Sequence, residues 1–352
     1  MRRGYWLACL MVVGCGATQE FETGAPFSSG APPPSDDAEE GGTAEPPSEP
    51  TDGPPTSGAT GGDPPSEDET GDDGPMGETG EPGDPNCYTE PLNPGADISD
   101  IVDNYGGAGW KDDLIEAMGR RWPAGAWLLQ EQYNDSYFGQ FSDPYSWTGM
   151  VGWLDTLVHE ETHLFNAYHA IDVGQNHALY FNEDLILYLP PDQGFPRAEI
   201  YGHLIPEAQA GIYAPTYLTG QQGQRAFNPL LDETLAYINE VPGLSVFGEY
   251  YQGGVSLRDG AAAFLYFIEV YLRVARTDHP EFYAWAQSQA VYVEAVRTAW
   301  LRTHFFYEEV ADMYPGLGIS DDIYRAAATT PENLAEIEMF IGEPVDASSC
   351  LP

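Results

Sequence analysis

Basic residues are scarce in this sequence, and their scarcity excludes several classes of function. The 352 residues include 13 Lys and Arg against 56 Asp and Glu, which gives a formal net charge of −43 at pH 7. So acidic a chain repels the phosphates of nucleic acids and the headgroups of anionic lipids. We therefore expect no nucleic-acid partner, and the acidity indicates solubility or an extracellular, ion-rich setting.

The one short apolar stretch near the start, residues 5–13, is too short to span a bilayer. It follows two arginines and precedes a small glycine, an order typical of a secretory signal. Residues 12–15 read VVGC and resemble a bacterial lipobox. This resemblance implies that residues 1–14 are a lipoprotein signal peptide and that the exported protein touches the membrane only through a lipidated Cys15. The absence of an acidic residue next to that cysteine favours the outer membrane, and a simple secreted protein is the alternative.

Bulky apolar residues are almost absent from residues 16–86 after Phe27. This stretch carries 18 acidic and no basic residues, so it cannot bury enough apolar surface to offset the entropy lost on ordering. We predict that residues 15–86 are a disordered, self-repelling tether. Residues 87–352 then form the globular part, as one large domain or as two lobes.

Cysteines are few, which limits disulfide chemistry. Of the four, Cys9 and Cys15 lie in the predicted signal and lipobox. The remaining two, Cys87 and Cys350, stand at the two ends of the globular part, and an exported protein folds in an oxidising compartment. We expect a disulfide between them, with two unpaired thiols as the alternative.

Residues 159–163, with the sequence HEETH, are the strongest functional feature. Apolar residues recur at helical spacing over residues 150–168, which predicts a helix. The imidazoles of His159 and His163 then stand one turn apart on one face, with about 6 Å between their Cβ atoms. That spacing suits two ligands of a single metal ion, and Glu160 follows the first ligand as a candidate general base.

The pattern H-E-x-x-H resembles the motif of zinc metallopeptidases of the zincin group. The resemblance implies a Zn²⁺ ion held by His159 and His163, a water whose proton Glu160 accepts, and a peptide or protein substrate. It also implies a zincin-like fold. Two alternatives stay open: a non-catalytic surface lipoprotein for binding or adhesion, with an accidental or degenerate motif, and a metal-dependent hydrolase of a non-peptide bond.

Three residues compete to be the third zinc ligand. Glu233 is preferred, because it lies on a helix predicted over residues 228–242 and resembles the ligand glutamate of gluzincins. Glu183 follows an asparagine, as the ligand does in gluzincins, but its surroundings alternate like a strand. If that strand face is buried, the carboxylate needs a metal or an arginine such as Arg197 as its partner. His169 falls at the position of the third ligand in metzincins, in the sequence HEETHLFNAYH. The sequence leaves the choice open.

Further polar residues are candidates for supporting roles. Tyr237 and His203 are candidate donors to the oxyanion of a tetrahedral intermediate, with Tyr237 preferred. Asp155 is placed to orient a motif histidine from one helical turn away. The guanidinium groups of Arg197 and Arg258 suit a substrate carboxylate. For each of these residues the alternative is ordinary packing or a structural ion pair.

The pattern of elements predicts an α+β fold, with a mixed upper lobe that carries the motif helix and a mostly helical C-terminal lobe. We expect a monomer. Predicted strands cover residues 126–130 and 179–189, and predicted helices cover residues 112–121, 150–168, 228–242, 260–276, 280–306 and 332–340.

Overall fold

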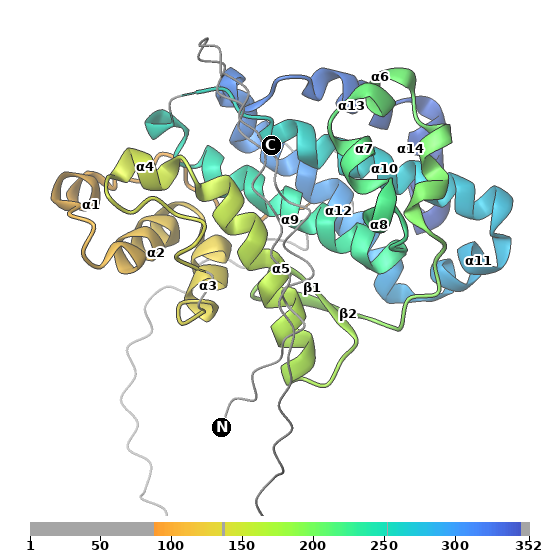
Figure 1. Ribbon diagram of the computed structural model, residues 1–352, viewed down its shortest axis with the longest axis horizontal. Coiled ribbons are helices and arrows are strands. Elements are labelled where there is room, and N and C mark those ends of the chain that lie inside the picture. The colour runs from red at the N-terminus through yellow and green to blue at the C-terminus, as the bar shows by residue number, and fades with distance from the viewer. Residues whose placement is uncertain (1–87, 136–137, 252, 346–352) are drawn as a thin grey trace, which may run out of the picture. The chain divides into compact units, whose positions relative to one another are not determined.

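Helices make up most of the chain that the structure describes, and the described residues contain one sheet of two strands. The structure is a computed structural model that describes residues 88–135, 138–251 and 253–345 (Figure 1). The fold agrees with the α+β class in coarse terms. The predicted signal peptide, lipobox, tether and disulfide all lie outside the described residues.

The contacts among the described residues place them in one compact unit. No helix within the described ranges is long and apolar enough to cross a membrane. The α-helices are α1 (Ser99–Asn104), α2 (Trp110–Arg121), α3 (Pro123–Glu131), α4 (Trp147–Val151), α5 (Leu154–Asp172), α6 (Pro206–Ala210), α7 (Tyr213–Tyr217), α8 (Gly220–Gly223), α9 (Phe227–Ser245), α10 (Leu257–Asp278), α11 (Pro280–Ser288), α12 (Ala290–Glu309), α13 (Asp321–Ala328) and α14 (Pro331–Ile341). The remaining elements are the strands β1 (His177–Asn182) and β2 (Leu185–Leu189) and the 3₁₀ turns η3 (Arg197–His203), η4 (Gly248–Tyr250), η5 (Ala311–Met313) and η6 (Pro315–Leu317).

The strands β1 and β2 form an antiparallel hairpin, where a single strand was predicted over residues 179–189. Leu179 pairs with Leu187 across the hairpin. The chain turns at Asp184, whose amide donates to Oδ1 of Asn182 (3.0 Å). Asn and Asp side chains favour such turns because they form hydrogen bonds with the local backbone. The turn divides the segment into two strands, although its alternating apolar pattern predicts one continuous strand.

The strand predicted over residues 126–130 is wrong, because these residues belong to α3. Pro123 begins that helix at a position where the missing N–H would have no helical partner in any case. The residues that follow include two Ala and two Leu, which are good helix formers. A short apolar run fits a buried helix as well as a strand, and here the helix forms.

The predicted helices are present, with shifted ends. The motif segment begins as the short α4, where the side chain of Ser146 accepts from the amide of Gly149 (3.0 Å). The chain then breaks at Gly152 and continues as α5. The helix predicted over residues 280–306 is in fact two helices, α11 and α12, which meet at Gln289.

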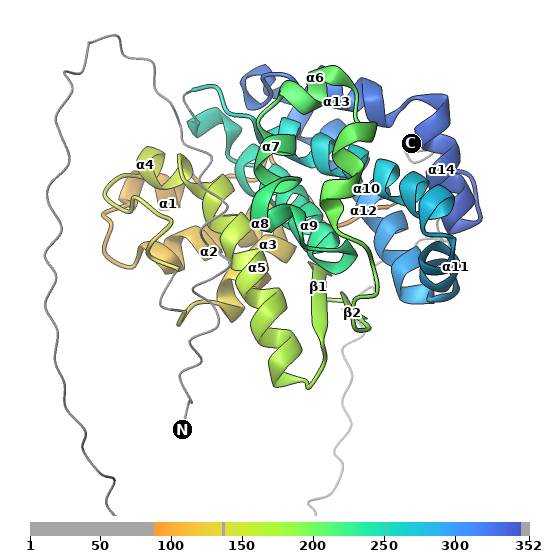
Figure 2. The ribbon, with the colours of Figure 1, turned by 45° about the vertical axis from the view of Figure 1, so that its right-hand side comes forward.

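Helix α9 is the centre of the fold. It is buried at every position except Pro229 and packs against α5, α10 and α12 (Figures 1 and 2). It continues through Pro242 to Ser245, although the proline was predicted to end it. A Cβ on the next residue, Gly243, would stand 2.9 Å from Cγ2 of Val158, so the glycine allows α9 to approach the motif helix closely.

Glu269 on α10 is a fully buried carboxyl. Burial raises its pKa well above the ordinary value of 4.5, against smaller opposing effects of Trp300 and Arg273. The folded protein therefore holds this proton more tightly than the unfolded chain does. The resulting stability is fully present below the unfolded pKa and is lost as the pH rises towards the folded pKa.

We therefore expect Glu269→Gln to stabilise the protein increasingly between about pH 5 and pH 8, by up to about 1.4 kcal/mol per pH unit. The measurement is the free energy of urea unfolding at each pH, taken relative to the unmodified protein. Glu332→Gln is the control, because that side chain is 74% exposed and its substitution should show no such trend. A difference for Glu269→Gln that stays constant over this range would contradict the prediction.

Candidate metal centre

Three side-chain atoms converge between α5 and α9. Nε2 of His159 lies 3.2 Å from Nε2 of His163, and Oε2 of Glu233 lies 3.8 Å and 3.4 Å from these two atoms. Tetrahedral zinc ligands at about 2.0–2.1 Å from the ion stand about 3.3–3.4 Å apart. The three atoms thus have the spacing of ligands around one small cation, and the three residues form a group that can hold a metal ion.

A carboxylate from α9 stands behind each imidazole. Nδ1 of His163 lies 2.7 Å from Oδ2 of Asp232, and Nδ1 of His159 contacts Oε1 of Glu240. A carboxylate accepts from an N–H, so Asp232 and the ionised form of Glu240 favour the tautomers with the proton on Nδ1, which direct the lone pair of each Nε2 towards the centre. Carboxylates orient the histidine ligands of metal sites in this way.

With both protons on Nδ1, the three converging atoms are all acceptors. Oε2 of Glu233 is buried and has no hydrogen-bond partner among the described residues. Three lone pairs buried face to face are unfavourable without a positive charge between them. A divalent cation satisfies all three at once, so the residues present fit a metal ion.

Burial acts to raise the pKa values of the carboxyl groups on α9, and their neighbours decide the outcome. For Asp232, burial is outweighed by nearby histidines, chiefly His163, and the pKa falls to about 2. For Glu233, burial is outweighed by histidines and Arg197, and the pKa is lowered. For Glu240, burial prevails and raises the pKa to about 7. Asp232 and Glu233 are therefore ionised at neutral pH, as a supporting group and a ligand need to be.

Asp232 is itself held in place from the side of the hairpin. Its Oδ1 accepts from Nδ2 of Asn166 (2.7 Å), and Oδ1 of that asparagine accepts from the amide of Tyr180 on β1 (2.8 Å). Nε2 of His177 stands 3.7 Å from the same aspartate oxygen. Residues of the β1–β2 hairpin thus help to hold Asp232, the carboxylate that contacts His163, in position.

Sequence reasoning missed the supporting roles of Asp232 and Glu240, and it proposed Asp155 as the orienting carboxylate. In the structure, Oδ1 of Asp155 accepts from the next backbone amide (2.7 Å), and Glu240 is the residue that contacts Nδ1 of His159. One signal was available in the sequence. Glu240 follows Glu233 by seven residues, nearly two helical turns, and therefore shares its face of α9.

The two other candidates for the third ligand lie elsewhere. Glu183 is exposed in the hairpin turn, so the condition of a buried strand face is not met. Nε2 of His169 lies 2.8 Å from the hydroxyl of Tyr188. Because α5 continues without interruption to Asp172, His169 points about 240° around the helix from His163 and away from the centre.

Tyr237, the predicted catalytic tyrosine, lies beside the candidate metal centre. Its ring packs edge-on against His159, with 4.7 Å between the ring centroids, and its hydroxyl lies 2.7 Å from that of Tyr217. Helix α10 leaves room for this ring through Gly260, where a Cβ would stand 2.2 Å from it. His203, in contrast, is exposed at the end of η3, so its position lends no support to a role at the centre.

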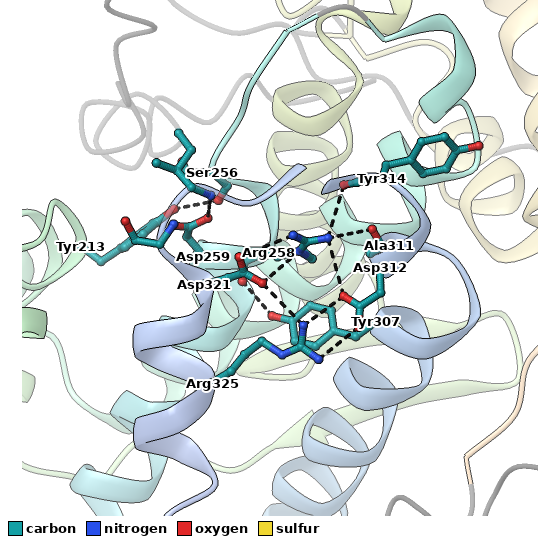
Figure 3. Close-up of polar contacts among 12 residues, drawn as sticks. Tyr213, Ser256, Arg258, Asp259, Tyr307, Ala311, Asp312, Tyr314, Asp321 and Arg325 are labelled. Carbon is teal, nitrogen blue, oxygen red and sulfur yellow. Dashed lines mark hydrogen bonds and ion pairs between the residues drawn. The ribbon is translucent and has the colours of Figure 1, made fainter. Parts of the chain in front are cut away.

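The two candidate arginines have different surroundings. Arg258 belongs to a polar cluster between α10, α12 and α13 (Figure 3). Its Nε donates to Asp321 (3.0 Å), and its Nη1 donates to the carbonyl oxygens of Ala311 (2.9 Å) and Tyr314 (3.3 Å). These hydrogen bonds connect separate segments of the chain, which indicates a structural role for Arg258. The charge of Arg197, in contrast, helps to lower the pKa of Glu233.

Comparisons with known proteins identify no relative of this chain. Neither a family model, a curated protein nor a solved structure matches it. The function of the site is therefore inferred from its own geometry and chemistry.

Proposed function

We propose that the protein is a zinc-dependent peptidase with a zincin-like active site. The observation that carries the proposal is the convergence of Nε2 of His159, Nε2 of His163 and Oε2 of Glu233 within 3.2–3.8 Å of one another, on helices that include an H-E-x-x-H motif. Two imidazoles and one carboxylate are the ligand set of catalytic zinc in several peptidases. Imidazole ligands favour zinc over the harder cations calcium and magnesium.

The residues around the centre supply the remaining chemistry. A bound zinc ion would polarise the substrate carbonyl and make water a stronger nucleophile at neutral pH. Glu160 follows His159 on α5 and is only 4% exposed, so its carboxylate is shielded from bulk water. It accepts the proton of the attacking water and passes it to the leaving amine. Tyr237 is the candidate donor to the oxyanion of the tetrahedral intermediate.

We further propose that the enzyme is exported and anchored to the cell envelope through a lipid on Cys15, and that it acts as a monomer on peptides or proteins. The lipobox-like residues 12–15 and the basic, apolar start of the chain support this location. The acidic composition of residues 16–86 supports a tether between the anchor and the enzyme.

Metal analysis and hydrolysis assays test the proposal together. We expect about one zinc ion per chain, and hydrolysis of casein or of a peptide library that a chelator abolishes and added Zn²⁺ restores. His159→Ala should lose both the zinc and the activity, whereas His203→Ala removes an exposed histidine and should keep the zinc. Protein without zinc and without hydrolysis would be the non-catalytic lipoprotein. Zinc-dependent cleavage of non-peptide bonds alone would identify the other alternative.

A further inference from the structure

Arg197 is a fully buried arginine at the start of η3. Its Nε donates to the carbonyl oxygen of Gln222 (2.9 Å), and its Nη2 donates to Oε1 of the same residue (2.7 Å). Its Nη1 is buried and has no hydrogen-bond partner in the part of the chain that the structure describes. A guanidinium keeps its charge in proteins. Arg197 therefore offers a buried, charged N–H group that this chain does not use.

Two tyrosines connect Arg197 to the candidate metal centre. The guanidinium of Arg197 lies 5.6 Å from the ring centroid of Tyr217, whose hydroxyl meets that of Tyr237 (2.7 Å). The ring of Tyr237 packs in turn against His159. Arg197 thus lies on the side of the centre that the two tyrosines line.

A buried donor without an acceptor is costly. The cost is larger for a charged group than for a neutral one. No Asp or Glu among the described residues forms an ion pair with Arg197, in contrast to Arg258, which is paired with Asp321 at 3.0 Å. Carboxylates bind guanidinium groups well, through charge-assisted hydrogen bonds. A carboxylate brought in by a ligand would therefore complete the surroundings of Arg197.

The centre itself is enclosed. His159 is 3% exposed, and Glu160 and Glu233 are each 4% exposed. The middle of a long polypeptide has to enter and leave such a site on two sides, whereas the end of a peptide needs access from one side only. Enclosure therefore favours a substrate that enters by its end, and the unused Nη1–H of the buried guanidinium favours the end that carries negative charge.

We propose that Arg197 binds the C-terminal carboxylate of the substrate, so that the enzyme is a carboxypeptidase that cleaves peptides close to their C terminus. This inference rests on the proposed peptidase function. In the reaction, water adds across one peptide bond: the C–N bond breaks, the hydroxyl joins the carbonyl carbon, and a proton goes to the nitrogen of the C-terminal product. That product keeps its carboxylate on Arg197 until it leaves.

Two peptide libraries test the inference with the full-length, zinc-loaded protein. Both consist of N-acetylated tripeptides, one with free C-terminal carboxylates and the other with C-terminal amides. We expect kcat/KM for the free acids to be roughly a hundredfold higher than for the amides. Arg197→Met should bring this ratio close to one. Arg225→Met, which removes the charge of a half-buried neighbouring arginine, should keep the ratio.

A binding measurement gives a readout that does not depend on turnover. Calorimetric titration of Glu160→Gln with the same peptides should show a similar preference for free acids, which the double variant with Arg197→Met loses. Equal cleavage and equal binding of acids and amides by protein with Arg197 in place would overturn the inference and leave the peptidase proposal standing. If Arg197→Met loses zinc and the protein with Arg197 in place shows no preference for free acids, the role of Arg197 would be limited to balancing the charge of Glu233. Absence of zinc and of all hydrolysis would instead contradict the proposed function, and the titration would still decide whether Arg197 binds carboxylates.

Discussion

Replacement of Glu160 by glutamine should lower kcat for peptide hydrolysis by about 10²–10⁴-fold while zinc stays bound. Glutamine has nearly the same shape as glutamate, but its amide does not take a proton from water. The three converging ligand atoms belong to His159, His163 and Glu233, so the substitution leaves all of them in place. Steady-state hydrolysis of a peptide library and elemental analysis of the same samples measure the two effects.

The matched control is Glu161→Gln, which makes the same chemical change one residue further along α5. Glu161 is also fully buried, but the helix rotates its side chain by about 100° from that of Glu160. We expect this variant to keep both zinc and most of its activity. Full activity in Glu160→Gln would show that the general-base assignment is wrong, and loss of zinc in that variant would point to a structural role.

The motif helix could be predicted from the sequence because its information is local. Apolar residues at helical spacing define α5, and the geometry of one helical turn then fixes how far apart His159 and His163 stand. Glu233 was preferred because of a resemblance, not because the sequence fixes its distance from the histidines. That distance depends on how closely α9 packs against α5. The close approach of the two helices is possible because Gly243 has no side chain to clash with Val158.

The supporting carboxylates depend on tertiary packing and were not predicted. The sequence shows that Asp232 and Glu240 are acidic, but it does not show that α9 is buried along nearly its whole length. Burial is what makes each carboxyl group need a partner, and the crossing of α9 over α5 is what supplies the histidines. The sequence favours Asp155 instead, because the spacing of residues along one helix follows from the sequence, whereas contacts between two helices do not.

The two errors in strand assignment have a common physical cause. Residues 126–130 and 179–189 are short apolar runs, whose spacing does not decide between a strand, a hairpin and a buried helix. For residues 126–130, Pro123 at the start of α3 and the Ala and Leu residues after it favour a helix. For residues 179–189, Asn182 bonds the amide of Asp184 and reverses the chain. Local signals of this kind outweigh the apolar pattern over short stretches.

Substitution of Glu90 by glutamine should destabilise the protein by about 3–5 kcal/mol, the largest effect on stability that we expect. Nε of Arg302 donates to Oε2 of Glu90 (2.9 Å), and both side chains are at most 2% exposed. Because the guanidinium cannot shed its charge, loss of the carboxylate leaves an uncompensated buried cation. Urea unfolding measures the loss as a lower midpoint.

Hydrogen bonds of Asn239 connect the same ion pair to the candidate metal centre. Nη1 of Arg302 donates to Oδ1 of Asn239 (2.5 Å), and Nδ2 of that residue donates to Oγ1 of Thr162 inside the motif (3.1 Å). Asn239 also directly precedes Glu240, which supports one of the motif histidines. We therefore expect Glu90→Gln to weaken zinc binding as well, by about tenfold, as measured by competition with a chelator.

The control for this prediction is the ion pair between Arg120 and Asp100 on the surface, whose side chains are 32% and 61% exposed. Asp100→Asn should lower the free energy of unfolding far less, because water and salt screen the exposed charges. A loss for Glu90→Gln as small as this would show that Arg302 finds another partner inside the protein. A large loss of stability with unchanged zinc affinity would instead separate the buried pair from the metal centre, and the path through Asn239 and Thr162 would then be only structural.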